Sequence, residues 1–168
     1  MRVFLVGPMG SGKSVLGRRL ATALGLAFED SDAWVERRAG ASLAWIFERE
    51  GEAGFRRRES EAIAELATRD DLVLATGGGA VLDATTRATL RSHGTVVFLA
   101  AEPATQHARL GADATRPLLA RGSDRAATLA ALYAARLPLY REVAHLELAT
   151  DEREVAELVA ELTARLPR

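Results

Sequence analysis

Apolar residues along the chain gather into five short runs, which are separated by longer segments with helical periodicity. The most uniform runs are apolar at nearly every position, as expected of parallel strands that are covered on both faces. The five predicted strands are residues 2–6, 27–29, 72–75, 95–100 and 145–148. Their alternation with helical segments predicts an α/β fold with a parallel sheet.

Helices are predicted where apolar residues recur three and four positions apart. They are residues 15–24, 34–38, 43–47, 55–66, a helix from about residue 83, 103–110, 124–136 and 155–166. Helix breakers set two of these boundaries. The Gly-Glu-Ala-Gly sequence at 51–54 separates two helices, and Pro138 ends a third, which leaves Arg136 at its terminus. Trp34 and Trp45 are interpreted as packing residues.

Composition narrows the class of protein. A chain of 168 residues with 48% apolar residues predicts one domain with a packed core. A net charge of −1 argues against nucleic-acid binding, which favours a basic surface. The absence of cysteine excludes disulfides and fits a cytoplasmic protein. No apolar run approaches the roughly 20 residues of a membrane span, and a strand at the N-terminus leaves no room for a signal peptide.

The first predicted strand leads into Gly-Pro-Met-Gly-Ser-Gly-Lys-Ser at 7–14, which fits the spacing of a phosphate-binding P-loop. Glycines let several backbone N–H groups point at phosphate oxygens, and the following helix adds partial positive charge. Lys13 is the only lysine among the 22 basic residues. A compact ammonium is therefore used only where it would contact phosphates. Ser14 would bind Mg²⁺.

Two further segments follow predicted strands. Asp30 and Asp32 are two residues apart, so on an extended segment they share a face, although the pair is equally typical of the first turn of a helix. The three glycines at 77–79 allow a ligand to approach the backbone closely, and a flexible turn is the alternative. Ligands bind at the carboxyl ends of strands in open α/β sheets.

Arginines supply the remaining candidate chemistry. Arg56 shares a side of its helix with Glu59 and the apolar stripe, so it is predicted to face inward. Arg57 and Arg58 are predicted to pair outward with Glu61. Residues 111–123 lack a clear period and are bounded by glycines, which predicts a mobile segment. Arg109 and Arg116 flank its first half, and surface arginines are the simpler interpretation of these two.

In this order, the motifs resemble the shikimate kinase family, whose members are small and have the nucleoside-monophosphate-kinase-like P-loop fold. The resemblance covers nearly the whole chain. It rests on the P-loop at 7–14, Phe-x-Asp-x-Asp at 28–32, Ile-Phe-x-x-x-Gly-Glu-x-x-Phe-Arg-x-x-Glu at 46–59, Gly-Gly-Gly at 77–79, Arg-Pro-Leu-Leu at 116–119 and Arg-x-Pro-x-Tyr at 136–140. It implies a three-layer α/β/α fold with a five-stranded parallel sheet of order 2-3-1-4-5, and one domain over 1–168.

The resemblance also implies a nucleotide side to the site. ATP and Mg²⁺ are expected, with Lys13 and the lid arginine Arg116 as catalytic residues. The implied ATP-binding residues are Gly10, Ser11, Gly12, Lys13, Ser14, Val15, Arg109, Arg116 and Arg153. Ser14 would ligate Mg²⁺ directly, and Asp30 would do so through water. Arg109 and Arg153 would lie near the adenine, and residues 111–123 would be the lid. Val15 departs from the threonine usual in the family.

The acceptor side is implied to lie within residues 30–60 and at two later segments. Asp32 would bind the hydroxyls of shikimate and would orient or deprotonate its 3-hydroxyl. Arg56 and Arg136 would clamp its carboxylate, with backbone contacts from Gly78 and Gly79. The expected protein is a cytoplasmic monomer that binds ATP and shikimate.

Two alternatives remain at this point. One is a kinase for another acceptor, of the gluconate or nucleotide type, because such enzymes share the P-loop and the lid. The other is a nucleotide-binding regulatory protein without catalysis. The Asp-Arg-glycine set argues against a nucleotide acceptor, and Lys13, Ser14, Asp32 and Arg116 argue against the loss of catalysis.

Overall fold

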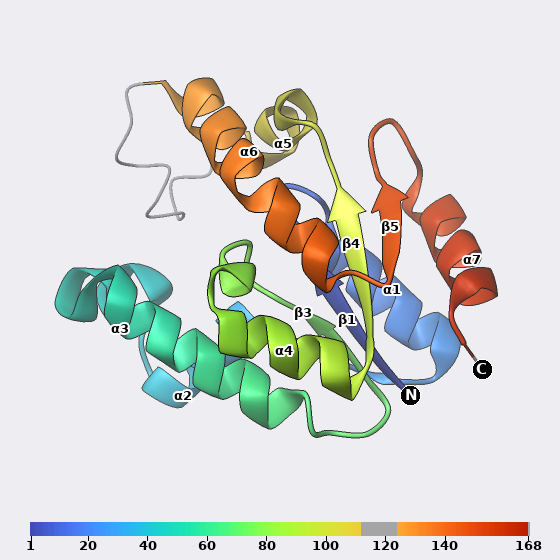
Figure 1. Cartoon of the computed structure of the whole chain (residues 1–168), viewed down its shortest axis with the longest axis horizontal. Coiled ribbons are helices and arrows are strands. Elements are labelled where there is room, and N and C mark those ends of the chain that lie inside the picture. The colour runs from blue at the N-terminus through green and yellow to red at the C-terminus, as the bar shows by residue number, and fades with distance from the viewer. Residues whose placement is uncertain (112–123, 168) are drawn as a thin grey trace.

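The structure, a computed structural model, describes residues 1–111 and 124–167. Five parallel strands form one sheet of order β2-β3-β1-β4-β5, as the resemblance implies (Figure 1). The strands are β1 (Arg2–Val6), β2 (Ala27–Asp30), β3 (Leu72–Ala75), β4 (Thr95–Ala100) and β5 (Leu146–Ala149). Three of them have the predicted bounds, while β2 ends one residue later and β5 lies one residue further along the chain.

Helices cover both faces of this sheet (Figure 1). Their bounds are α1 (Lys13–Leu24), α2 (Ser31–Ala39), α3 (Leu43–Leu66), α4 (Ala84–His93), α5 (Pro103–Leu110), α6 (Arg125–Val143) and α7 (Val155–Arg165), with a 3-10 turn η1 at Ala80–Leu82. α1 and α7 pack on one face, and α3, α4 and α6 pack on the other. The three-layer α/β/α prediction is confirmed. No helix of the described residues is both long and apolar enough to span a membrane.

β1 is the central strand and explains the division of the core. Val3 and Leu5 pack toward α1 and α7, whereas Phe4 and Val6 pack toward α3, α4 and α6. All four side chains are fully buried. Successive residues of a strand point to opposite faces, so a strand covered on both faces is apolar at every position. The continuous apolar run in the sequence has this cause.

Every strand is parallel, so all five carboxyl ends meet at one edge of the sheet. The P-loop follows β1, Asp30 ends β2, and residues 76–79 follow β3. Thr150 follows β5. The candidate functional residues therefore converge at the edge where open α/β sheets bind ligands.

The prediction that Pro138 ends its helix is wrong. α6 continues to Val143 with Pro138 inside it, so Arg136 lies within the helix and not at its terminus. A proline in a helix interior costs about 3 kcal/mol. Tyr140 and Val143 are at most 1% exposed, and each buried side chain of this size contributes roughly 1.5–3 kcal/mol. Burial of these two residues offsets the cost.

The predicted break at the glycine segment 51–54 is confirmed. Within α3, Gly51 has the non-helical values φ 70° and ψ −177°, so two helices meet there across a kink. Two other predictions differ from the structure. α2 begins at Ser31, three residues before its predicted start. Trp34 packs against the core as predicted, but Trp45 is 46% exposed, because it lies on the solvent side of α3.

Candidate active site

The loop after β1 has the conformation that its glycines allow. Gly7, Gly10 and Gly12 have φ values of 148°, 76° and 88°, which side chains with a Cβ rarely adopt. A Cβ at Gly10 would lie 2.9 Å from the carbonyl oxygen of Gln106 on α5. Lys13 Nζ lies over the loop and donates to the carbonyl oxygens of Gly7 and Pro8, each at 2.7 Å. The loop, its lysine and the start of α1 form the phosphate-binding geometry that the spacing predicts.

Both carboxylate oxygens of Asp30 accept hydrogen bonds, each from a different part of the site. Its Oδ2 accepts a hydrogen bond of 2.6 Å from the Ser14 hydroxyl. Its Oδ1 accepts from the backbone N–H groups of Asp32 and Ala33, which makes Asp30 the N-cap of α2. The expectation that Asp30 and Asp32 share one extended segment is wrong, because Asp30 ends β2 while Asp32 lies in the first turn of α2.

Ser14 and Asp30 fit a magnesium site of the kind found in P-loop proteins. Mg²⁺ usually binds one or two protein oxygens and completes its shell with water and substrate phosphates. The described residues contain no group of three or more His, Asp or Glu side chains that could hold a metal by itself. A hydroxyl beside a carboxylate at the P-loop is therefore the donor set to which a metal–phosphate complex would bind.

Two carboxylates converge on Gly77, just after β3. A Cβ at Gly77 would lie 2.9 Å from Asp32 Oδ1 and would collide with Glu59 Oε1. The backbone N–H of Gly77 donates to the Ser31 hydroxyl at 3.1 Å, and Ser31 is fully buried. Because Gly77 has no side chain, the loop after β3 can lie close to both carboxylates. Ser31, at the start of α2, is a residue that the sequence did not single out.

Arg56 faces inward, as predicted from its place beside Glu59. Its Nη1 donates to Glu59 Oε2 at 2.6 Å, and its Nη2 lies 3.6 Å from Glu52 Oε1. The Glu59 side chain is 3% exposed. Burial raises the pKa of the Glu59 carboxyl above its usual range, and the positive charge of Arg56 opposes that rise. Glu59 therefore holds Arg56 at the cavity wall.

The predicted outward pairing with Glu61 is wrong for Arg58. Its guanidinium binds the carboxylate of Glu50 with two hydrogen bonds of 2.7 and 2.8 Å. Gly51 interrupts the regular helix between the two residues, so helical spacing does not predict this contact. Arg57 makes no ion pair with Glu61 in the described part of the chain.

Arg136 is the least exposed arginine of the cavity, at 5%. It makes no ion pair with any residue of 1–111 or 124–167, which is unusual for a buried charge. Its Nη1 lies 3.6 Å from the position of a Cβ at Gly78. One turn later, the Tyr140 hydroxyl donates to the carbonyl oxygen of Gly78 at 2.6 Å. Arg136 and Tyr140 thus contact the middle of the glycine triplet from the same helix.

Tyr140 had no role assigned from the sequence, although it belongs to the motif at 136–140. Its ring stacks on Phe98 of β4 with 5.0 Å between centroids, and it is fully buried. Burial raises the pKa of Tyr140 to about 12, so its hydroxyl stays a donor throughout the physiological range. The only signal in the sequence was its spacing of four residues from Arg136.

The nucleotide side of the cavity lies beyond the P-loop. Arg109 Nη1 donates to Gly10 O at 3.1 Å and to Thr150 Oγ1 at 3.0 Å, and its Nη2 donates to Thr150 O at 2.6 Å. Arg153 lies in the connection between β5 and α7. Val15 is 58% exposed. Arg116 and the predicted lid, apart from Gly111, lie outside the described residues.

One cavity of about 1100 Å³ joins these parts. Its volume exceeds that of most single-ligand pockets and suits a nucleotide beside a small second substrate. Every described residue that the sequence predicts for the site lines this cavity: Gly10, Ser11, Gly12, Lys13, Ser14, Val15, Asp30, Asp32, Arg56, Gly78, Gly79, Arg109, Arg136 and Arg153. The individual roles of these residues remain predictions.

A P-loop, a serine hydroxyl hydrogen-bonded to a carboxylate beside it, and a second group of residues that includes Arg56 and the buried Arg136 are typical of a P-loop kinase that acts on a small acceptor. The family model described as shikimate kinase matches residues 9–167. The chain belongs to the shikimate kinase family.

Individual relatives agree. A shikimate kinase from Pseudomonas entomophila is 52% identical over 98% of this chain and 95% of its own. One from Psychrobacter cryohalolentis is 50% identical over 98% of this chain and 88% of its own. The solved shikimate kinase from Acinetobacter baumannii, in complex with shikimate, has a TM-score of 0.94 and 44% identity over 99% of this chain and 95% of its own.

The alternative acceptors are not favoured by these comparisons. A gluconokinase from Sinorhizobium meliloti has a TM-score of 0.57 at 21% identity, and it covers 97% of this chain and 89% of its own. At that identity the likeness shows the fold alone. The chain is thus a phosphotransferase of the kinase class with an alcohol acceptor.

Proposed function

We propose that this enzyme transfers the γ-phosphoryl group of ATP to the 3-hydroxyl of shikimate, giving shikimate 3-phosphate and ADP in the pathway to aromatic amino acids. The observation that carries the proposal is Arg136. It is a buried arginine without an ion pair among the described residues, and it lines the same cavity as the P-loop. The Glu59 carboxylate interacts with its charge, and a carboxylated acceptor would supply the direct ion pair that Arg136 lacks within the described part of the chain.

On the nucleotide side, the P-loop N–H groups and Lys13 bind the phosphates of ATP. Ser14 directly and Asp30 through water would hold Mg²⁺ with the phosphates, and the ion supplies charge neutralisation at the β and γ oxygens. Asp30 also caps α2, which carries Asp32, so the same carboxylate contacts both Ser14 and the helix that carries the proposed acceptor-binding aspartate. Arg116 of the proposed lid completes the charge around the transferred group.

On the acceptor side, Arg56 and Arg136 bind the carboxylate of shikimate, with backbone contacts from Gly78 and Gly79. Asp32 accepts hydrogen bonds from the hydroxyls, orients the 3-hydroxyl toward the γ-phosphorus and takes its proton. Phosphoryl transfer needs positioning and charge neutralisation more than covalent participation of the protein. Both requirements are met by side chains on α2, α3, α6 and the P-loop.

An ADP-release assay with a panel of acceptors tests the proposal. ADP should form with shikimate and not with gluconate, nucleoside monophosphates or water. A preference for gluconate or a nucleotide would replace shikimate with another acceptor. ATP binding by folded protein without turnover on any acceptor would favour a regulatory protein. We expect a monomer that works in the cytoplasm, and sedimentation of the pure protein tests the monomer.

A further inference from the structure

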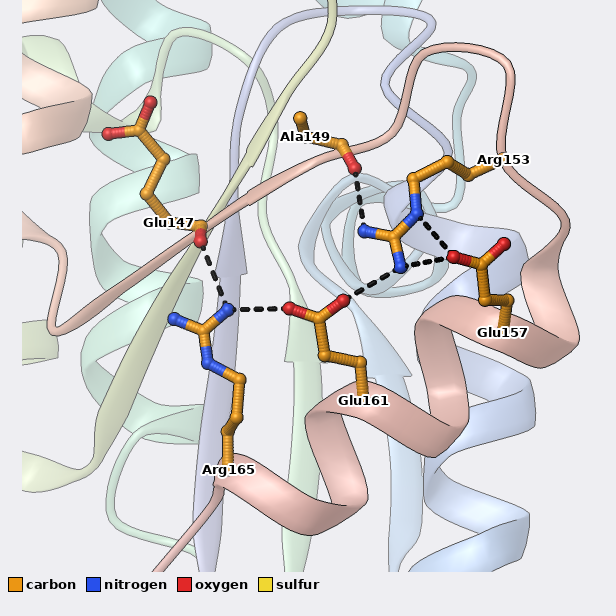
Figure 2. Close-up of polar contacts among 6 residues, drawn as sticks. All are labelled: Glu147, Ala149, Arg153, Glu157, Glu161 and Arg165. Carbon is orange, nitrogen blue, oxygen red and sulfur yellow. Dashed lines mark hydrogen bonds and ion pairs between the residues drawn. The ribbon is translucent and has the colours of Figure 1, made fainter.

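Two carboxylates of α7 hold the side chain of Arg153 in place. Figure 2 shows its guanidinium between two carboxylates of that helix. Nε and Nη2 donate to Glu157 Oε1 at 2.9 and 2.6 Å, and Nη2 also donates to Glu161 Oε2 at 2.7 Å. Nη1 donates to the carbonyl oxygen of Ala149 at 3.4 Å. Glu161 is itself fixed, because its Oε1 accepts from Arg165 at 2.8 Å.

These contacts occupy the edge of the guanidinium. An arginine has five N–H groups in one plane, and four hydrogen bonds here direct that plane's edge toward protein oxygens. The flat face is therefore the main surface that Arg153 offers to a ligand. A guanidinium face stacks on planar aromatic groups, whereas phosphate binding uses the N–H edge.

Charge leads to the same conclusion. Arg153 and Arg165 are balanced by Glu157 and Glu161, so the four side chains carry no net charge. Hydrogen bonds from the two arginines lower the pKa of Glu161, which keeps it ionised. A neutral cluster is a poor partner for a triphosphate, but it suits an uncharged base.

Simple stabilisation of α7 does not explain the arrangement. Arg153 lies just before Glu154, the N-cap of α7, where the helix dipole disfavours a cation. An arginine four residues before a glutamate is also the weaker of the two orientations for a helical ion pair. A residue chosen for helix stability would be acidic at this position. The arginine is unfavourable for the helix and lines the cavity.

We propose that Glu157 and Glu161 are positioning residues that hold the guanidinium of Arg153 as a flat platform for the nucleobase of ATP. Ordering a free arginine on binding costs part of the affinity, and the two carboxylates order it beforehand. The inference rests on the nucleotide side of the proposed function and does not depend on the acceptor.

The test compares ATP with inorganic tripolyphosphate, which has the phosphates but no base. In the double variant Glu157→Gln, Glu161→Gln we expect Kd and KM for ATP to rise about two- to tenfold, the equivalent of ordering one long side chain. Tripolyphosphate affinity and the KM for the acceptor should stay unchanged. In an Arg153→Ala background, the same pair of substitutions should add nothing.

Glu147→Gln, on β5, is the matched control, because it removes the ion pair with Arg141 of α6 and leaves the Glu147 carbonyl oxygen in place. It should leave ATP binding unchanged. Equal weakening of tripolyphosphate, an effect that persists without Arg153, or unchanged ATP binding in the folded double variant would each overturn the inference. If the wild type bound ATP but did not phosphorylate shikimate, the proposed function would fail while the binding comparison still tested the platform.

Discussion

Gly79→Ala should damage the acceptor side of the site without unfolding the protein. A Cβ at Gly79 would lie 2.5 Å from Arg56 Cζ and 2.6 Å from its Nη1. The backbone does not oppose the change, because Gly79 has φ −96° and ψ 2°, which alanine also adopts. The methyl group is therefore accommodated by displacing the end of the Arg56 side chain by about 1 Å, to an ordinary contact distance.

The expected loss of activity follows from the proposed contact between Arg56 and the carboxylate of shikimate. A hydrogen bond between a guanidinium and a carboxylate contributes roughly 1.5–3 kcal/mol, and each 1.4 kcal/mol is a factor of ten. A misplacement of about 1 Å can cost a hundredfold. We therefore expect kcat/KM for shikimate to fall about 10- to 100-fold. The KM for ATP should change less than about twofold, because the P-loop is untouched. The melting temperature should shift by only a few degrees.

Coupled ADP release measures both constants, and Arg56→Ala provides the control. If Gly79→Ala acts through Arg56, adding it to Arg56→Ala should cause no further loss. Wild-type kcat/KM for shikimate in Gly79→Ala would refute the reasoning. So would a full additional loss in the double variant, since the methyl group would then obstruct the ligand itself.

Two other predictions concern buried polar contacts. Tyr140→Phe removes the donor to Gly78 O and should lower the free energy of unfolding by about 1 kcal/mol. It should also raise KM for shikimate more than KM for ATP, and urea unfolding with steady-state kinetics checks both. His145 Nδ1 accepts from the Val96 N–H at 3.0 Å, and burial, followed by Arg91, lowers the pKa of His145. The stabilisation that neutral His145 gives the fold should be complete above its unfolded pKa of about 6.5 and should be lost as the pH falls through its lowered folded pKa. His145→Gln should therefore flatten the pH dependence of the free energy of unfolding between about pH 7.5 and 5.5. An unchanged slope would contradict this.

The sequence predicted the parts of the fold that local patterning decides. β1, β3 and β4 have the predicted bounds because each is a continuous apolar run. The P-loop follows from glycine spacing, and α4 begins at Ala84, next to its predicted start at about residue 83. Predictions were wrong where tertiary contacts determine the structure. Pro138 was predicted to end its helix, but burial of Tyr140 and Val143 stabilises the helix beyond it.

The same distinction applies to the site. Sequence motifs and family resemblance identified the cavity residues, but not how they are supported. Glu59 beside Arg56 was expected from helical spacing, but the contacts of Tyr140 with Gly78 and of Glu161 with Arg153 join residues that the sequence did not connect. For Asp30 the sequence left open a face shared with Asp32 or a helix cap, and the structure shows the cap, while the other carboxylate oxygen accepts from Ser14.

Arg136→Ala is the most direct test, because the two halves of one cavity are proposed to bind two different substrates. In steady-state ADP release, KM for shikimate should rise by about 10- to 100-fold through loss of an arginine–carboxylate contact, while KM for ATP stays within about twofold. Equal increases in both constants, or an unchanged KM for shikimate in folded protein, would contradict the assignment of Arg136 to the acceptor carboxylate.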